Sequence, residues 1–289
     1  MAEVSARVAV VHSIAALPES CEEGDTVFVD IDETLLVPEP DASEAWARQL
    51  AAQLGGGSGW PAACHLWAAL QGVCEARACE ARATRDALDA LRRRGLRVHG
   101  LTSRDCRVAE ETFRQLAACG LDGIFEQKTL GELARGEGGG APIWHERGVV
   151  YCAGSRKAEG VESFERRGGG GRHGRVVLID DRLQHVQAVC EALERQGRGF
   201  LGLHYVREGA DAHGDYALPH SVKLLARALA TRRGRAHVLA ALDALEGEPA
   251  RHAHAMPSRR HSLMVASVSF LVGVTVGATA LIARGVRRS

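Results

Sequence analysis

An acidic pair follows an apolar run near the start of the chain. Residues 27–36 read V-F-V-D-I-D-E-T-L-L, so Asp30 and Asp32 stand two positions apart and Thr34 follows them. Ligands of open α/β sheets bind at the carboxyl ends of the strands, which is where this pair would project. Burying two carboxylates costs free energy unless positive charge lies opposite them. The pattern therefore predicts acid–base or metal chemistry; a capped turn between strand and helix is the alternative.

Three further apolar runs end in polar groups of complementary chemistry. They are Thr102, Ser103 and Arg104 after residues 96–101, Lys157 after residues 149–153, and Asp180 and Asp181 after residues 175–179. Each group alone has an ordinary structural explanation, such as an N-cap for Thr102 or a surface charge for Lys157. A lysine at a helix start is nevertheless an unfavourable partner for the helix dipole. Four such ends in one chain favour a shared site over four separate explanations.

The order and spacing of these four segments resemble the haloacid dehalogenase-like superfamily over about residues 25–206. The first and fourth segments are the specific ones. Within the superfamily, D-I-D-E-T-L-L followed by Trp46, then L-T-S-R and I-D-D, looks like a poorly characterised subgroup usually labelled a domain of unknown function. The resemblance implies a Rossmann-like fold and a phosphoryl-transfer site, because dehalogenases of the superfamily lack an aspartate at the position of Asp32.

The resemblance also implies a role for each residue of the site. Asp30 would be the nucleophile that forms an aspartyl-phosphate, and Asp32 the general acid and base. Thr102 would hold a phosphoryl oxygen, and Lys157 would neutralise the nucleophile and the phosphate. Mg²⁺ would be bound by Asp30, by the main-chain carbonyl of Asp32 and by one of the two acids Asp180 and Asp181. The residues expected to bind substrate are Thr34, Ser103 and Arg104.

Elementary electrostatics supports a cation at such a site. A carboxylate is a weak nucleophile toward a phosphate dianion, so positive charge must screen their repulsion. Mg²⁺ prefers a few carboxylate oxygens together with water and substrate phosphate, which this acidic set offers. We therefore expect a Mg²⁺-dependent phosphohydrolase acting on a phosphorylated small metabolite or protein. The alternative, from another class, is a membrane-tethered scaffold or binding protein that keeps the fold without turnover.

The elements that must position these residues alternate between strands and helices. The expected strands are 26–31, 96–101, 149–153, 175–179 and 200–206, and the expected helices include 84–94, which ends at Gly95, and 157–167. Such alternation is typical of βαβ units around a parallel sheet. The pattern therefore predicts an α/β fold with a parallel central sheet, and the resemblance implies a Rossmann-like three-layer sandwich. We expect residues 1–24 to be a lead-in and residues 25–246 to form the catalytic domain.

The stretch between Asp30 and Thr102 is longer than a bare crossover needs. It predicts two helices, 44–54 and 62–81, separated by the glycine-rich residues 55–59. A small helical cap over residues 41–82 is the expected use. Three tryptophans of this stretch could line the cap, although packing in its core is the more ordinary role; they are Trp46, Trp60 and Trp67.

Composition excludes several other functions. Lys+Arg and Asp+Glu are both 36, so no net charge attracts nucleic acid, and we expect none as a partner. The 8 cysteines include no CxxC pair and follow no signal peptide, which predicts free thiols in a reducing compartment. The spacing of Cys64, His65, Cys74 and Cys79 does not fit a common zinc site. A structural role is expected for His185. Lys128 is the alternative to Lys157 as the lysine of the site.

The C-terminal segment predicts a membrane anchor. Residues 263–283 carry no charged side chain and lie between arginine clusters. As a helix they would extend about 31 Å, close to the hydrocarbon thickness of a bilayer. We expect residues 247–262 to be a tether and the catalytic domain to face the cytosol from a single-pass tail anchor. A buried core helix is the alternative.

Two finer expectations concern the anchor. Its moderate hydrophobicity and basic flanks favour the mitochondrial outer membrane or the peroxisome over the endoplasmic reticulum. Gly273 and Gly277 form a GxxxG pattern, which allows two anchors to pack closely. A homodimer is therefore possible through the membrane segment.

Overall fold

The structure is a computed structural model of the 289-residue chain. It describes residues 7–39, 44–53, 63, 66–67, 70–71, 73–135, 142–154, 156–169, 174–207, 224 and 231–232. The chain divides into two compact units, each considered by itself below. One comprises residues 1–37 and 76–212, and the other comprises residues 38–75 and 213–289.

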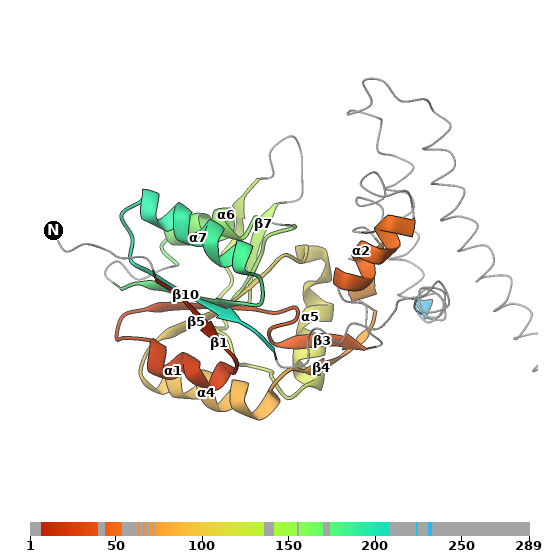
Figure 1. Ribbon diagram of the computed structural model, residues 1–289, viewed down its shortest axis with the longest axis horizontal. Helices are drawn as coiled ribbons and strands as arrows, with labels where there is room; N and C mark the ends of the chain where they lie inside the picture. Colours follow the sequence, from red (N-terminus) through yellow and green to blue (C-terminus); the bar gives the residue numbers. More distant parts are fainter. Residues whose placement is uncertain are drawn as a thin grey trace, which may run out of the picture. The chain divides into compact units, whose positions relative to one another are not determined.

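The first unit is built on a mostly parallel sheet (Figure 1). Its strands are β1 (Arg7–Val11), β2 (Thr26–Asp30), β5 (Arg97–Thr102), β6 (Gly131–Ala134), β7 (Ile143–Glu146), β8 (Val149–Tyr151), β9 (Val176–Asp180) and β10 (Phe200–Tyr205). Their order across the sheet is β1-β10-β9-β2-β5-β8-β7-β6. The pairs from β1 to β8 are parallel, whereas β7 runs antiparallel to both β8 and β6. The expected parallel central sheet is confirmed for the strands that carry the candidate site.

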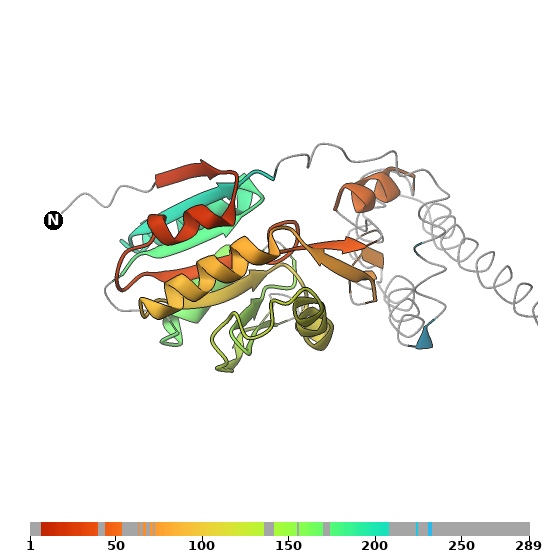
Figure 2. The same cartoon turned by 90° about the horizontal axis from the view of Figure 1, so that it is seen from below.

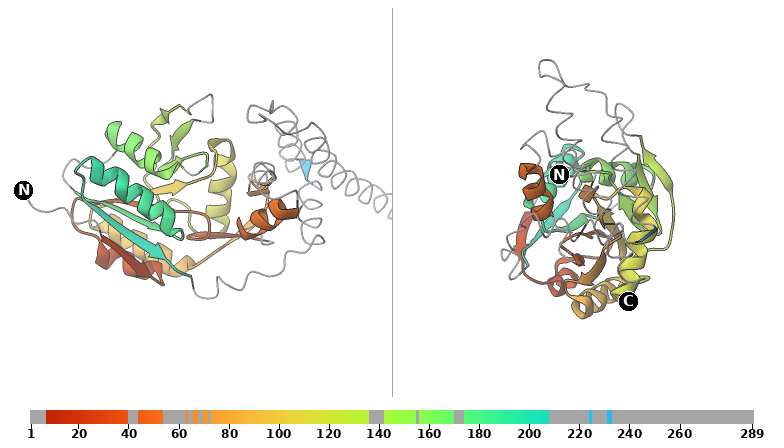
Figure 3. Two further views of the ribbon diagram at one scale, coloured as in Figure 1. Left: turned by 45° about the horizontal axis from the view of Figure 1, so that its top comes forward. Right: turned by 90° about the vertical axis from the view of Figure 1, so that its right-hand side faces the viewer.

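Helices cover both faces of this sheet. They are α1 (Leu17–Ser20), α4 (Ala81–Arg93), α5 (Ala109–Ala118), α6 (Lys157–Arg166) and α7 (Leu183–Arg195), with the short 3₁₀ helices η1 (Ile14–Ala16) and η3 (Cys106–Val108). Figure 2 shows α1 and α4 on one face, where they contact each other. The left view of Figure 3 shows α6 and α7 packed together on the opposite face. The unit is therefore a three-layer sandwich.

Strand β2 shows why the sheet requires two helical layers. Its residues are all buried, and successive side chains of a strand point to opposite faces. Val27 and Val29 belong to the core beneath α4 and α5, while Phe28 belongs to the core beneath α6 and α7. A continuous apolar run is the expected signature of a parallel strand that is buried on both faces.

The strands of the site are predicted correctly from the sequence, but the start of the unit is not. All five expected strands are present, with ends shifted by one or two residues. The boundary expected at residue 25 is too late, because β1 pairs in parallel with β10 and so adds an edge strand to the same sheet. Strands β6 and β7, which flank the glycine-rich residues 136–140, were not predicted.

The second unit and its connecting strands correct the expected cap. Helix α2 (Glu44–Gln53) confirms the first predicted helix, and Trp46 is fully buried there, which fits core packing. The predicted helix 62–81 is wrong at its end: residues 75–78 form β4 (Glu75–Ala78), which pairs with β3 (Leu36–Glu39). Strand pairing has overridden the helix propensity of this alanine- and arginine-rich segment. The role of the stretch as a cap stays a prediction.

The predicted anchor lies outside the described residues, as do the tether, Gly273, Gly277, Trp60, Cys64 and His65. Across the ranges that the structure describes, no helix combines the length and the apolarity needed to cross a membrane.

Candidate functional site

The carboxyl end of β2 lies where the direction of the sheet order reverses. From β2 the chain passes to β5 and β8 on one side, and then returns to β9 and β10 on the other side. Ligands of open α/β sheets bind at such a switch point. The register places Asp30 opposite Leu101 of β5 and Val29 opposite Ile179 of β9. Asp30, Thr102 and Asp180 therefore end their strands at the same edge.

Lys157 joins two of these strand ends. Its ammonium group donates hydrogen bonds to Oδ1 of Asp30 and, at 2.6 Å, to Oδ2 of Asp180. All three side chains are buried, with at most 4% exposed. Burial alone disfavours the ammonium, but Asp180 and Asp30 outweigh it and raise the pKa of Lys157. Lys157 is thus held charged between two acids that lie far from it in sequence.

Close packing of α6 fixes where Lys157 lies. Gly160, one turn after Lys157, faces β8 so closely that a Cβ atom there would lie 2.6 Å from Sγ of Cys152. A glycine lets the helix approach the sheet at this point. The first turn of α6 is thereby held against the edge where Asp30 lies. The alternative lysine, Lys128, is exposed instead.

Thr34 connects Asp30 to the second acidic pair. Its hydroxyl donates to Oδ2 of Asp30 at 2.9 Å and accepts from the main-chain N–H of Asp181 at 3.1 Å. Thr34 is fully buried. The residue lies at the site as expected, but its hydroxyl holds the nucleophile candidate in place, and its expected contact with substrate stays a prediction.

Three carboxylates of the site could hold a metal ion. Oxygens of Asp30, Asp180 and Asp181 all lie within 4.8 Å of one another. Burial and the neighbouring carboxylates of Asp30 and Asp180 raise the pKa of Asp181 to about 9. Burial likewise raises the pKa of Asp30 to about 6, despite the opposing charge of Lys157. Three acids facing one ammonium leave negative charge uncompensated, so this donor set fits a hard cation with oxygen ligands.

The carboxylate of Asp32 is paired with Arg104 and lies outside the group of three acids. The guanidinium donates from Nη2 to Oδ1 of Asp32 at 2.8 Å and from Nε to Oδ2 at 3.0 Å. Thr102 donates to Oδ2 of Asp32 at 3.4 Å and accepts from the main-chain N–H of Arg104 at 3.1 Å. The carboxylate of Asp32 is not in the three-acid group, and the main-chain carbonyl expected as a metal ligand stays a prediction.

The chain matches the family described as "Protein of unknown function (DUF2608)" over residues 7–224. It belongs to this family. No curated protein and no solved structure matches the chain. The expected placement in a group labelled as of unknown function is therefore confirmed, and the matched range covers β1 to β10 together with every residue of the site described above.

Several members of the site in this DUF2608 chain were missed or assigned only a structural role. Nδ1 of His185 lies 3.3 Å from Oδ1 of Asp180, because α7 begins immediately after the acidic pair. The main-chain N–H of Arg182 donates to the same oxygen at 2.9 Å. Burial raises the pKa of Asp180, but Lys157 and His185 outweigh burial and lower it. The spacing of His185 from Asp180 was the available signal.

The polar groups of Ser103 and Arg104 are buried, whereas a side chain that binds substrate is expected to be accessible. Oγ of Ser103 is buried and has no hydrogen-bond partner in the part of the chain that the structure describes. The guanidinium of Arg104 is buried and already bonded within the protein. Contacts of either residue with substrate stay predictions.

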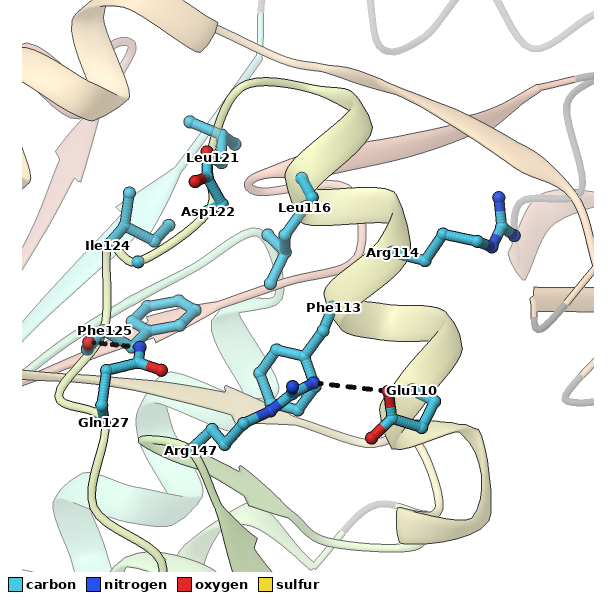
Figure 4. Close-up of a pocket in the computed structure, with 12 residues that line it drawn as sticks. Glu110, Phe113, Arg114, Leu116, Leu121, Asp122, Ile124, Phe125, Gln127 and Arg147 are labelled. Carbon is cyan, nitrogen blue, oxygen red and sulfur yellow. Dashed lines mark hydrogen bonds and ion pairs between the residues drawn. The ribbon is translucent and has the colours of Figure 1, made fainter.

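A separate pocket lies between α5 and residues 121–127 (Figure 4). It has a volume of about 370 Å³ and contains none of the residues expected at the site. Figure 4 shows the guanidinium of Arg147 over the ring of Phe113, 3.5 Å from its centroid, with an ion pair to Glu110 at 3.7 Å. The residues that line it include Arg114, Leu116, Leu121, Asp122, Ile124 and Phe125.

Proposed function

We propose that this chain is a Mg²⁺-dependent phosphohydrolase of the haloacid dehalogenase-like type, acting through an aspartyl-phosphate on Asp30. One observation carries the proposal: the buried ammonium of Lys157 bonds Asp30 and Asp180 at the carboxyl edge of a parallel sheet. A salt bridge that served stability alone could be replaced by apolar residues at little cost. A carboxylate that must attack a phosphate dianion, in contrast, requires adjacent positive charge.

The strand order supports the same assignment. The four strands that precede the chemical groups are adjacent in the order β9-β2-β5-β8. The nucleophile candidate is on β2, flanked by the strand of the second acidic pair and by the strand that ends in Thr102. This arrangement is compatible with the Rossmann-like fold that the resemblance implies for residues 25–206.

Asp30 and Asp32 carry out the two chemical steps of the reaction. In the first step an oxygen of Asp30 forms a bond to phosphorus while the bond to the leaving-group oxygen breaks. That oxygen keeps the bonding electron pair and takes a proton from Asp32. In the second step water attacks phosphorus, the bond to Asp30 breaks, and Asp32 accepts a proton from the water. Inorganic phosphate and the alcohol are the products.

The remaining groups supply positive charge and hydrogen bonds. Lys157 balances the charge of Asp30, and Thr34 fixes the oxygen of Asp30 that does not contact Lys157. Asp30, Asp180 and Asp181 are the residues that would hold Mg²⁺, which supplies Lewis-acid charge to phosphate oxygens when bound. Thr102 remains the candidate for holding a phosphoryl oxygen. The substrate class is a phosphomonoester of a small metabolite or a protein.

Asp30→Asn in the full chain tests the proposal. The amide keeps the shape of the side chain but does not form an acyl-phosphate, so turnover of para-nitrophenyl phosphate with Mg²⁺ should fall by more than about a hundredfold. Acid-quenched wild-type protein should carry a phosphoryl group on Asp30 by mass spectrometry. Substitution of Lys157 is less informative, because removing one partner of a buried ion pair costs about 3–5 kcal/mol of stability.

Asp122→Asn is the matched control, since the side chain of Asp122 is 74% exposed on the surface. Its activity should equal that of the wild type. Retention of more than about a hundredth of the rate by Asp30→Asn contradicts the assignment of the nucleophile. Failure of the wild type to hydrolyse any phosphomonoester in a broad panel supports the scaffold alternative instead.

A further inference from the structure

A buried arginine links the site to the inner face of α5. The side chain of Arg104 is 1% exposed, and its donors are used in two directions. Nε and Nη2 contact the two oxygens of Asp32, while Nη1 donates to Oγ1 of Thr112 at 3.0 Å and to Oε1 of Gln115 at 2.7 Å. Thr112 is anchored in turn, because its hydroxyl donates to the main-chain carbonyl of Val108 at 2.8 Å.

This geometry fixes the direction of one carboxylate. An aspartate side chain rotates about two bonds, and a single hydrogen bond leaves its plane free. A guanidinium that contacts both oxygens removes that freedom, because its donors lie in one plane. The guanidinium is itself held by two residues, three positions apart, on the same face of α5. The orientation of Asp32 is thereby set through α5.

Asp32, like Asp181, is partly exposed to solvent. Its side chain is 18% exposed, against 4% for Asp30 and 0% for Asp180. A group that transfers a proton to a departing alcohol must lie at the open side of the site. Proton transfer of this kind depends on reach and direction within about 3 Å.

We propose that Arg104 is a positioning residue, held by Thr112 and Gln115, which aims Asp32 at the leaving-group oxygen. The inference rests on the proposed phosphohydrolase function. It assigns to Arg104 a role different from the substrate contact that the sequence suggested. The bonds formed and broken are those of the two steps given above, and Arg104 itself exchanges no proton.

Leaving groups of different basicity distinguish positioning from general structural support. A poor leaving group such as phenol needs a proton as its bond breaks, whereas para-nitrophenolate departs with little help. The ratio kcat/KM reports formation of the phosphoenzyme, the step in which Asp32 donates. A misdirected Asp32 should therefore slow phenyl phosphate much more than para-nitrophenyl phosphate, two substrates of closely similar shape.

Arg104→Lys in the full chain tests the proposal, because it keeps the charge but loses the planar pair of donors. We expect kcat/KM to fall at least about tenfold with phenyl phosphate and at most about threefold with para-nitrophenyl phosphate, since a positioned general acid contributes about 10²- to 10⁴-fold. Thr112→Val and Gln115→Leu should also lower kcat/KM more with phenyl phosphate than with para-nitrophenyl phosphate, which lowers the ratio of the two values. Arg114→Gln, on the exposed side of α5, is the control and should leave it unchanged.

Each result of this experiment decides the question. Equal losses with the two substrates, or no loss, in variants that keep the wild-type circular dichroism would overturn the positioning role. If Arg104→Lys does not fold, Thr112→Val and Gln115→Leu give the answer by the same ratio. A wild-type chain that hydrolyses no phosphomonoester of the broad panel overturns the proposed function and this inference together. An active wild type whose variants keep the wild-type ratio of the two kcat/KM values overturns the inference alone.

Discussion

Lys157 and Arg104 both contact aspartates of the site, but they constrain these carboxylates differently. Lys157 places one compact charge between Asp30 and Asp180, which balances charge without fixing the plane of either carboxylate. Arg104 spreads its charge over a planar fork and fixes Asp32. The difference follows from the two side chains, because an ammonium acts as a point charge and a guanidinium as an oriented pair of donors.

Cation binding at Asp181 should raise the thermal stability of the chain. Its pKa is raised to about 9 in the folded chain, so the folded state holds its proton more tightly than the unfolded state does. Without cation, the stability that Asp181 contributes is present at low pH and is lost as the pH rises toward about 9. Mg²⁺ should restore it, and we expect the wild-type Tm at that pH to rise by at least about 3 °C.

Asp181→Asn removes the charge that the cation balances. Its Tm without Mg²⁺ should fall less with rising pH than that of the wild type, and the increase on adding Mg²⁺ should shrink. Differential scanning calorimetry with and without a chelator measures both effects, and Asp122→Asn serves as the control. Equal Mg²⁺ shifts in the wild type and in Asp181→Asn would remove Asp181 from the metal site.

At the scale of elements, an aromatic cluster joins β5 and β7 to α6. The ring of His99 lies 4.6 Å from that of Phe164 and 5.8 Å from that of His145, measured between centroids. Both histidines are buried, His99 on β5 and His145 on β7. Nε2 of His99 lies 3.4 Å from a carboxylate oxygen of Glu126. The cluster stabilises the fold only while its imidazoles are neutral.

Acid should therefore destabilise the chain through His99. Burial, with His145 and Arg97 nearby, lowers the pKa of His99 to about 3. The unfolded state thus binds a proton first, so the stabilising contribution is present above about pH 6.5 and is lost as the pH falls from there toward about 3. Between pH 7 and pH 5 this amounts to about 2 kcal/mol.

His99→Leu should reduce the acid sensitivity by about that amount. Urea unfolding of the full chain at the two pH values gives the free energy of unfolding of each variant. His12→Leu, at an exposed position, is the control and should keep the wild-type sensitivity. An unchanged pH dependence in His99→Leu would show that His99 is not the group that titrates.

At the scale of the whole molecule, the proposed catalytic unit and the predicted anchor are separate parts of the chain. The strands of the site end by Tyr205, and the family match ends at residue 224. The apolar residues 263–283 lie beyond both. We propose that this segment anchors the chain in a membrane with the proposed site facing the cytosol.

A reporter fusion tests the anchor directly. Residues 257–289 fused to a soluble reporter should carry it into a membrane fraction that resists carbonate, because a helix satisfies its own backbone hydrogen bonds in lipid. Val272→Arg with Val276→Arg should release it, since a charge at the centre of the span costs about 2.5–3.5 kcal/mol per residue. Extraction of the unaltered fusion by carbonate would contradict the anchor and favour a buried helix. Microscopy of the same reporter distinguishes the mitochondrial outer membrane from the peroxisome.

Much of the candidate site could be predicted from the sequence alone. Asp30, Lys157 and Asp180 follow apolar runs, and the carboxyl ends of parallel strands share one edge of a sheet. Their meeting is therefore a consequence of local pattern together with the handedness and order of βαβ units. Pattern also determined the two-layered helical covering, because a strand without polar alternation must be buried on both faces.

Only the tertiary structure decided how each side chain is used. The sequence places Arg104 directly after a strand, but it does not show that the guanidinium turns inward to Asp32, because its partners Thr112 and Gln115 come from a different element. Strand β4 was likewise decided by pairing with β3 and not by the helix propensity of its own residues. The physical reason is the same in both cases: local periodicity fixes which face a residue occupies, whereas its partner depends on elements that only folding brings together.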